Sequence, residues 1–324
     1  MSALERSMRL LAQHVSWLIL GLSVLAWPCL GFAAPRQVVV VLSDGSAPYQ
    51  EAARAISAGL EGEIGSGKLA IRTVVAGEPG AEAINAQPDT LLVPLGVKAV
   101  QFLARSDAPI LAGLLARQSY EKLTEPESGA AHRRQASAIY LDQPLSRHIQ
   151  LMRAVLPRVQ HIGVLLGASH QDTRAELSES ASNAGLHLAS ATLNSSADLF
   201  PALQTMLSNV DLLLLWPDPM VVNRNSVQSL MLTTYRQRVP VLGYSQNLVE
   251  AGALAAVFST PQQIGQQLAE TIQRMLPGKT WELPPPTYPK YFTVKTNQNV
   301  ARSLALAIPS ETVLLQRMSA GSGL

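Results

Sequence analysis

The sequence predicts an α/β protein with two doubly wound parallel-sheet lobes and a cleft between them, and two patterns lead to that class. Several short segments are apolar at nearly every position, and helical patterns separate them. The apolar segments are VVVVL (38–42), LLVPL (91–95), PILAGLL (109–115), HIGVLL (161–166) and VDLLLLW (210–216). A strand with one wet face would alternate polar and apolar residues. Continuous apolarity therefore indicates strands that helices cover on both faces.

Three of the intervening stretches have the spacing of an amphipathic helix. The predicted apolar stripes are Leu145, Ile149, Met152 and Leu156; Val227, Leu230, Met231 and Tyr235, after Asn225; and Ile264, Leu268, Ile272 and Met275. Thr260 and Gln263 match a capping box around Pro261, which indicates where the third helix begins.

The strand–helix alternation occurs twice, which predicts the two lobes. The first set spans roughly residues 37–115, and the second runs from near Ala138 to about Ser245. The polar stretch 125–136 between them indicates a surface loop. The proline-rich segment LPPPTYP (283–289) cannot form a central strand, so it is expected to be an extended connector.

The N-terminus is typical of a secretory signal peptide. Arg6 and Arg9 precede an apolar run at 15–30, and small residues then allow cleavage before Ala34. The alternative is an uncleaved membrane anchor, although the run is a little short for a span and Pro28 interrupts it. We therefore expect residues 1–33 to be removed and the protein to reside in the periplasm.

Charge and cysteine content exclude several classes of function. Residues 1–33 hold two of the 25 basic and one of the 23 acidic residues, so the mature chain carries a net charge of +1. That balance gives no basic footprint for nucleic acid. The single cysteine, Cys29, lies within the signal segment, which leaves no disulfide and no cysteine metal site in the mature protein.

Two stretches resemble catalytic motifs but lack essential parts. GEIGSGKL (62–69) matches a phosphate-binding P-loop, except that Leu69 replaces the hydroxyl residue and a helix, not a strand, is expected before it. GYSQN (243–247) resembles a nucleophile elbow without its last glycine, and no histidine follows His187 to act as the base. We read the first as a surface turn and predict that the protein is not an enzyme.

No cofactor or metal site is predicted either. No G-x-G-x-x-G follows a strand, so a dinucleotide is not indicated. The histidines of the mature chain are scattered, and surface or turn positions are the default for them: His132, His148, His161, His170 and His187.

The residues just past the apolar strands are mostly small or hydrogen-bonding. Ligands of open α/β sheets bind beyond the carboxyl ends of the strands. We therefore predict a ligand-binding site made of Ser43, Asp44, Gly96, Val97, Ser169, Trp216, Asp218, Tyr244 and Ser245. Ser43 and Gly96 would lie near helix N-termini that suit a carboxylate, and Trp216 and Tyr244 would contact a ring-bearing or apolar part of the ligand. For any single residue, ordinary turn chemistry is the alternative.

Three stretches resemble a family of ABC-transporter substrate-binding proteins that includes tryptophan- and tyrosine-binding members. These are AVLPRVQHIGVLLG (154–167), VPVLGYSQNLVEAGALAAVFSTPQQIGQQLAE (239–270) and FTVKTNQNVARSLALAIP (292–309). The resemblance covers roughly residues 37–315. It implies a type I periplasmic binding fold, in which residues 34–137 with about 250–280 form one lobe and residues 138–249 with about 285–315 form the other.

The resemblance implies a monomeric periplasmic protein that delivers a small molecule to a membrane permease. An amino acid or another carboxylate is a candidate ligand. A sensor or adaptor of the same fold, serving a receptor or signalling partner, is the alternative. This alternative arises because cleft-side stretches depart from the family pattern at LLARQSYEKL (114–123), RRQASAIY (133–140) and 167–170. The family's amino-acid ligands therefore do not carry over directly.

Overall fold

The computed structural model describes residues 35–79, 81, 90–124, 135–278 and 280–321. The expected signal peptide with Cys29, His132 and most of the expected loop 125–136 lie outside these residues. None of the helices in the described part is long and apolar enough to cross a membrane.

The first of two sheets has five parallel strands among these residues, in the order β2-β1-β3-β4-β5. In that order the strands span Leu69–Val75, Arg36–Leu42, Thr90–Leu95, Ile110–Gly113 and Ala136–Ile139. The central β3 is buried at every position, and β1 is buried from Val38 onward. The continuous apolar runs of the first lobe are thus confirmed as strands of a parallel sheet.

The second sheet has six strands in the order β11-β10-β9-β8-β6-β7, and only β11 is antiparallel to its neighbour in the described residues. The strands span Thr293–Thr296, Ala255–Phe258, Val241–Gly243, Leu212–Leu214, His161–Gly167 and His187–Leu193. The prediction of an α/β protein with two parallel-sheet lobes is therefore confirmed.

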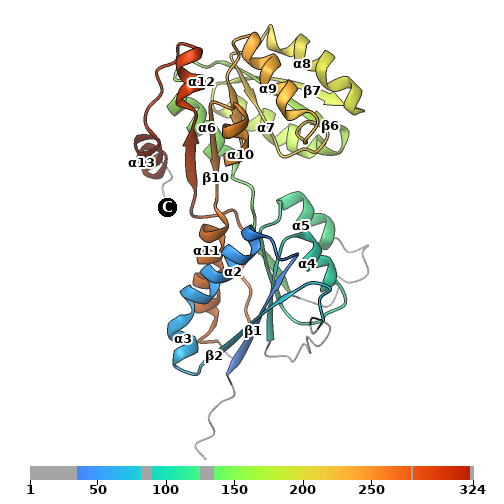
Figure 1. Cartoon of the computed structure of the whole chain (residues 1–324), viewed down its shortest axis with the longest axis vertical. Coiled ribbons are helices and arrows are strands. Elements are labelled where there is room, and N and C mark those ends of the chain that lie inside the picture. The colour runs from blue at the N-terminus through green and yellow to red at the C-terminus, as the bar shows by residue number, and fades with distance from the viewer. Residues whose placement is uncertain (1–34, 80, 82–89, 125–134, 279, 322–324) are drawn as a thin grey trace, which may run out of the picture. The chain divides into compact units, whose positions relative to one another are not determined.

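Helices cover both faces of the first sheet. Helices α2 (Ala47–Gly59) and α11 (Pro261–Met275) share one hydrophobic core with Val38 and Val40. Helices α4 (Val97–Phe102) and α5 (Arg117–Thr124) cover the other face. Figure 1 shows α11 beside α2, although about 200 residues separate them in the sequence. The chain therefore returns to the first sheet after it has built most of the second.

The second sheet is covered in the same way. One core contains α6 (Leu145–Val155), α7 (Gln171–Asn183), α12 (Gln298–Ser303) and α13 (Glu311–Gly321). The opposite core contains α8 (Leu199–Leu207), α9 (Val227–Arg236) and α10 (Gln246–Ala251). The remaining short elements are α3 (Glu61–Gly65) and the 3₁₀ turns η2 (Ala168–His170) and η3 (Ser196–Asp198).

The buried faces of the three helices agree with the predicted apolar stripes to different extents. All four residues of the third stripe are buried, and the Thr260–Gln263 capping box is present as expected. In α9, Leu230 and Met231 are buried, but Tyr235 is 49 % exposed and the helix begins after Ser226. In α6 the buried face is shifted: it consists of His148, Leu151, Met152 and Val155. The 3.6-residue spacing identified each helix, but it did not select the buried face of α6.

The proline-rich connector lies along the first sheet. Thr287 forms an isolated parallel bridge to Ile139, its N–H donates to the Ala138 carbonyl at 2.9 Å, and the Tyr140 N–H donates to its carbonyl at 2.9 Å. Proline cannot supply ladder N–H groups on both sides, so this segment is confined to the sheet edge. The predicted extended connector is thus present.

The strand membership changes two of the expected lobe boundaries. The expected boundary at Ala138 falls inside β5, a strand of the first sheet, and β10 pairs in the second sheet although 250–280 were expected in the first lobe. We therefore propose that the first lobe contains residues 36–139 and α11. The second lobe then contains residues 145–258 and the chain from Thr293, the first residue of β11, onward.

The P-loop look-alike connects α3 to β2, as the surface-turn interpretation requires. The Lys68 side chain is 70 % exposed and its Nζ lies 3.6 Å from Glu63 Oε2. Lys68→Ala should change the free energy of unfolding by less than about 0.5 kcal/mol, because exposed ion pairs contribute little. Isothermal titration with ATP should show no Lys68-dependent binding. Saturable binding that disappears in Lys68→Ala would contradict the interpretation.

Candidate ligand-binding site

A pocket of about 200 Å³ lies where strands from both sheets end. Its walls come from the residues that follow β4, β5, β8, β9 and β10, and from the first turn of α6. The lining residues are Ala116, Leu141, Asp142, Gln143, His148, Trp216, Pro217, Tyr244, Ser245, Phe258 and Ser259. The carboxyl ends of five strands thus meet at one cavity, which is where open α/β sheets bind ligands.

His148 and Trp216 form one wall of this pocket. Their ring centroids lie 5.6 Å apart and the rings are tilted by 54°. The His148 side chain is buried, and its Nδ1 has no hydrogen-bond partner among the described residues. Burial and the nearby Arg147 guanidinium lower the pKa of His148 to about 4, so its ring is neutral at pH 7. An unpaired nitrogen of this kind is costly unless a ligand or water satisfies it.

Tyr244 and Ser245 follow β9 and form a second wall. Tyr244 is half-buried; desolvation, and then the Asp218 carboxylate, raise the pKa of its hydroxyl. Ser245 is the N-cap of α10, and its Oγ accepts a hydrogen bond of 3.4 Å from the Leu248 N–H. Tyr244, directly before this cap, lines the pocket.

The amide of Gln143 is already committed within the pocket floor. Its Nε2 donates to Ser259 Oγ at 2.9 Å, and its Oε1 accepts from Arg147 at 2.6 Å. Ser259 donates in turn to the Tyr291 carbonyl at 2.5 Å. This network ties the segments that follow β5 and β10 to each other, so it holds the pocket floor rather than offering free groups.

Asp142 is the carboxylate that lines the pocket. Its Oδ2 accepts a hydrogen bond from the Arg117 N–H, and desolvation raises its pKa. The Arg117 guanidinium turns to other partners, because one of its nitrogens lies 2.8 and 2.9 Å from the two oxygens of Glu176 and the other donates to Tyr288 Oη at 3.0 Å. This ion pair joins α5, which packs on the first sheet, to α7, which packs on the second.

The structure brings Trp216, Tyr244 and Ser245 together, but Ser43, Asp44, Gly96 and Val97 do not line this pocket. The Ser43 hydroxyl is buried, donating to the Leu95 carbonyl at 2.8 Å and accepting from the Ala99 N–H at 3.0 Å. Gly96 has a φ of +88°, and a Cβ there would lie 2.6 Å from Ser43 Oγ. Asp44 caps the Ser46 N–H, and Val97 is 37 % exposed. The observed contacts of Ser43, Asp44 and Gly96 are turn chemistry.

Ser169 and Asp218 also lie outside the pocket lining, and both contact the ring of the buried His170. Asp218 Oδ2 lies 3.0 Å from His170 Nδ1 and accepts from the Gly167 N–H at 2.6 Å. Ser169 Oγ lies 3.2 Å from the same Nδ1. A catalytic relay needs the serine and the carboxylate on opposite ring nitrogens, so this trio is not a nucleophile site. It fixes the turn after β6.

The histidine expectation needs correction at one position. His148 is 2 % exposed and lies within α6, whereas surface or turn positions were expected; His170 is buried but does lie in the turn η2. No group of three or more His, Cys, Asp or Glu side chains that could hold a metal ion occurs within the part of the chain that the structure describes.

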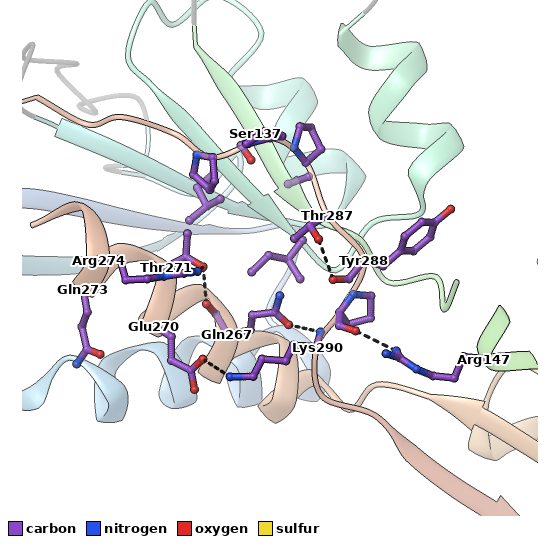
Figure 2. Close-up of a pocket in the computed structure, with 17 residues that line it drawn as sticks. Ser137, Arg147, Gln267, Glu270, Thr271, Gln273, Arg274, Thr287, Tyr288 and Lys290 are labelled. Carbon is purple, nitrogen blue, oxygen red and sulfur yellow. Dashed lines mark hydrogen bonds and ion pairs between the residues drawn. The ribbon is translucent and has the colours of Figure 1, made fainter. Parts of the chain in front are cut away.

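A larger cavity, about 940 Å³, lies elsewhere, between α11 and the segment 284–290. Figure 2 shows that its polar side chains largely bond to one another: Lys290 Nζ lies 3.7 Å from Glu270 Oε2, and Arg147 donates to the Pro289 carbonyl at 2.9 Å. It follows the side of β5 and α11 rather than the strand ends, and none of the predicted site residues lines it. We therefore take the smaller pocket as the candidate site.

Sequence reasoning missed several pocket residues for identifiable reasons. Gln143 and Ser259 follow β5 and β10, and reading past the ends of ASAIY and ALAAVF would have found them. His148 had no such signal, because a histidine on an amphipathic helix is ordinary.

The comparisons with known proteins agree with this architecture. Residues 141–319, more than half of the chain, match the profile of a family described as ABC transporter substrate binding protein. No curated protein matches the chain significantly. Among solved structures, a ligand-free, open substrate-binding protein with adhesive properties from Clostridium difficile is 16 % identical with a TM-score of 0.66, over 85 % of this chain and 96 % of that one.

Two further structures share the fold. An ABC domain in complex with L-Trp from Streptococcus pneumonia is 19 % identical with a TM-score of 0.55, over 86 % of this chain and 98 % of that one. A periplasmic ribose ABC transporter protein from Conexibacter woesei is 12 % identical with a TM-score of 0.51, over 88 % and 98 %. At these identities the likeness concerns the fold.

Two largely parallel sheets covered by helices are the architecture that the chain shares with these solved binding-protein structures. The chain belongs to the ABC transporter substrate-binding protein family. This confirms the family resemblance seen in the sequence. Because the family consists of binding proteins, it also confirms the prediction that the chain is not an enzyme.

Proposed function

We propose that the protein binds a small molecule in the pocket formed by Trp216, Tyr244 and His148, and delivers it to an ABC-type permease from the periplasm. The observation that carries the proposal is the convergence of five strand ends on one partly apolar cavity. Family membership supports the transport role. The signal-like N-terminus supports export, with removal of residues 1–33.

Tyr244→Ala should weaken ligand binding by about 1 to 2 kcal/mol, or roughly five- to thirtyfold, because it removes a half-buried ring and hydroxyl from the pocket wall. The measurement is a thermal-shift screen of amino acids, aromatic compounds, nucleosides and metal chelates, followed by titration of each hit. A ligand at a hundredfold excess over its Kd stabilises the folded state by about 2.7 kcal/mol. Tyr235→Ala is the matched control, because Tyr235 is 49 % exposed on α9. Equal affinity in both variants would reject this pocket.

The Arg117–Glu176 pair should assist closure of the two lobes around the ligand. Glu176→Gln should weaken ligand binding by up to about 1 kcal/mol at low salt, since Glu176 is 50 % exposed and water screens the pair. The effect should vanish in 1 M NaCl, where the Debye length is about 3 Å. Glu179→Gln, also exposed on α7, is the control. A salt-independent loss would assign Glu176 a different role.

The departures of 114–123 and 167–170 from the family pattern favour a second candidate, a periplasmic sensor or adaptor that serves a receptor or signalling partner. Both candidates share the ligand pocket, so binding cannot separate them. A permease encoded beside this chain, reconstituted in proteoliposomes, can separate the two candidates. Ligand-loaded protein that stimulates ATP hydrolysis supports transport, and stimulation of a neighbouring receptor or kinase instead supports the sensor.

A further inference from the structure

We infer that this pocket takes an uncharged, ring-bearing small molecule of one or two fused rings, and that the ring system is held by Trp216 and Tyr244 and hydrogen-bonded by His148. The inference rests on the proposed function and names the ligand class of that same site. It differs from the amino acid or other carboxylate that the family resemblance suggests.

The first observation is that none of the described residues that line the pocket has a cationic side chain. Arg117 and Arg147, which adjoin the lining residues Ala116 and His148 in the sequence, are committed elsewhere. Arg147 donates to Gln143 and to the Pro289 carbonyl, and its guanidinium lies 4.3 Å from the Phe292 ring centroid. Arg117 is held by both oxygens of Glu176 and by Tyr288. A ligand carboxylate would therefore lose its hydration without gaining an ion-pair partner, which is strongly unfavourable.

The expected carboxylate positions do not compensate for this. The Ser43 hydroxyl already satisfies the Ala99 N–H at the start of α4, so it is not available to an anion. Asp142, the acidic side chain that lines the pocket, offers no positive charge to a carboxylate in either of its protonation states.

The second observation is the chemistry of the groups that remain free. The neutral His148 ring has a buried, unpaired Nδ1. Trp216 and Tyr244 carry N–H and O–H donors for which no hydrogen bond to another described residue occurs. Leu141, Pro217 and Phe258 supply apolar surface around them. Aromatic faces with a few uncharged hydrogen-bonding groups suit a ring with one polar substituent or ring heteroatom.

Size gives the third constraint. The pocket holds about 200 Å³, and an apolar cavity of about 150 Å³ in another protein accepts benzene. One ring or two fused rings therefore fit, and a disaccharide or a nucleotide does not.

A cationic ring compound is the nearest competitor, because Asp142 and the aromatic faces could attract it. Asp142 is less suited to this role than an exposed carboxylate, because desolvation favours its neutral form and its Oδ2 already accepts the Arg117 N–H. The test therefore includes ring compounds of each charge state.

The test compares four indole compounds that share one ring system: indole, tryptamine, indole-3-acetate and L-tryptophan. Isothermal titration at pH 7 should give indole at least about tenfold tighter binding than the charged three, a difference of about 1.4 kcal/mol. His148→Phe keeps an aromatic ring but removes Nδ1, so it should weaken indole binding about tenfold. Tyr235→Phe, outside the pocket, should leave it unchanged. Circular dichroism confirms that each variant is folded.

The outcomes separate this inference from the proposed function. If indole-3-acetate, tryptophan or tryptamine binds more tightly than indole and Tyr244→Ala abolishes the binding, the pocket is a ligand site but the uncharged class is wrong. The class is equally wrong if only a compound from the wider screen binds in a Tyr244-dependent way and that compound is charged or lacks a ring. If no indole compound and nothing in the wider screen binds, both the inference and the proposed function fail.

Discussion

Replacing Gly265 with leucine is expected to lower the free energy of unfolding by roughly 3 kcal/mol, at the upper end of the usual cost of overpacking. Gly265 lies where α11 packs closely against α2. A Cβ at this position would lie 2.4 Å from the Ala52 carbonyl oxygen and 2.8 Å from the Ala55 Cβ. The backbone oxygen cannot turn aside as a flexible side chain would, so the two helices must separate. Separation exposes Ile264 and Leu268, which are fully buried in the first core.

Urea unfolding followed by circular dichroism measures this effect as a lower midpoint with an unchanged slope. Gly265→Ala should also destabilise, although alanine is the better helix former by about 1 kcal/mol. Gly62→Ala is the matched control, because Gly62 is also in a helix but a Cβ there meets nothing within 4 Å. Gly62→Ala should be neutral or slightly stabilising. A Gly265→Ala protein as stable as the native one would show that α2 and α11 can move apart without cost.

The strands that were predictable are those covered on both faces. VVVVL and HIGVLL are apolar at nearly every position because helices pack on each side of β1 and β6. The edge strand β7 has only one residue, Leu193, fully buried, so its sequence HLASATL carries no continuous apolar signal. The four-residue β5 was missed as a strand of the first sheet for a different reason: it is buried from Ser137 onward, but its first three residues, ASA, have little apolar surface. A run of large apolar residues reports burial, so it finds neither a partly buried edge strand such as β7 nor a buried strand of small residues such as β5.

The candidate site was predictable in the second lobe and less so in the first. Trp216 and Tyr244 are large side chains directly after buried strands, and both line the pocket. Ser43 obeys the same positional rule, but its hydroxyl turns inward to the Ala99 N–H. The position of a residue past a strand end follows from sequence, whereas the direction of a small hydroxyl depends on which N–H is nearest. His148 lies in a helix, so the strand-end rule could not find it.

His148 is expected to make the stability of the protein fall steeply in acid. Burial lowers the pKa of its ring to about 4 in the folded state, and the ordinary value is 6.5. Between these values the unfolded chain binds a proton that the folded chain does not. The free energy of unfolding therefore rises with pH across this window. The contribution of His148 to stability is lost as pH falls from 6.5 towards 4. A shift of this size corresponds to roughly 2 to 3 kcal/mol between pH 7 and pH 4.5.

Comparison of the native protein with His148→Phe isolates this contribution, because all other titrating groups are common to both. Urea unfolding at pH 7 and pH 4.5 should show that the native protein loses roughly 2 to 3 kcal/mol more than the variant. His187→Gln, which removes an exposed histidine, should follow the native protein at both pH values. Phenylalanine also removes the unpaired Nδ1, so the variant is expected to match or exceed native stability in acid even if its packing is imperfect at pH 7. Parallel pH profiles for native and variant would mean that water or a conformational change hydrates His148, which would contradict the burial of its ring beside Trp216.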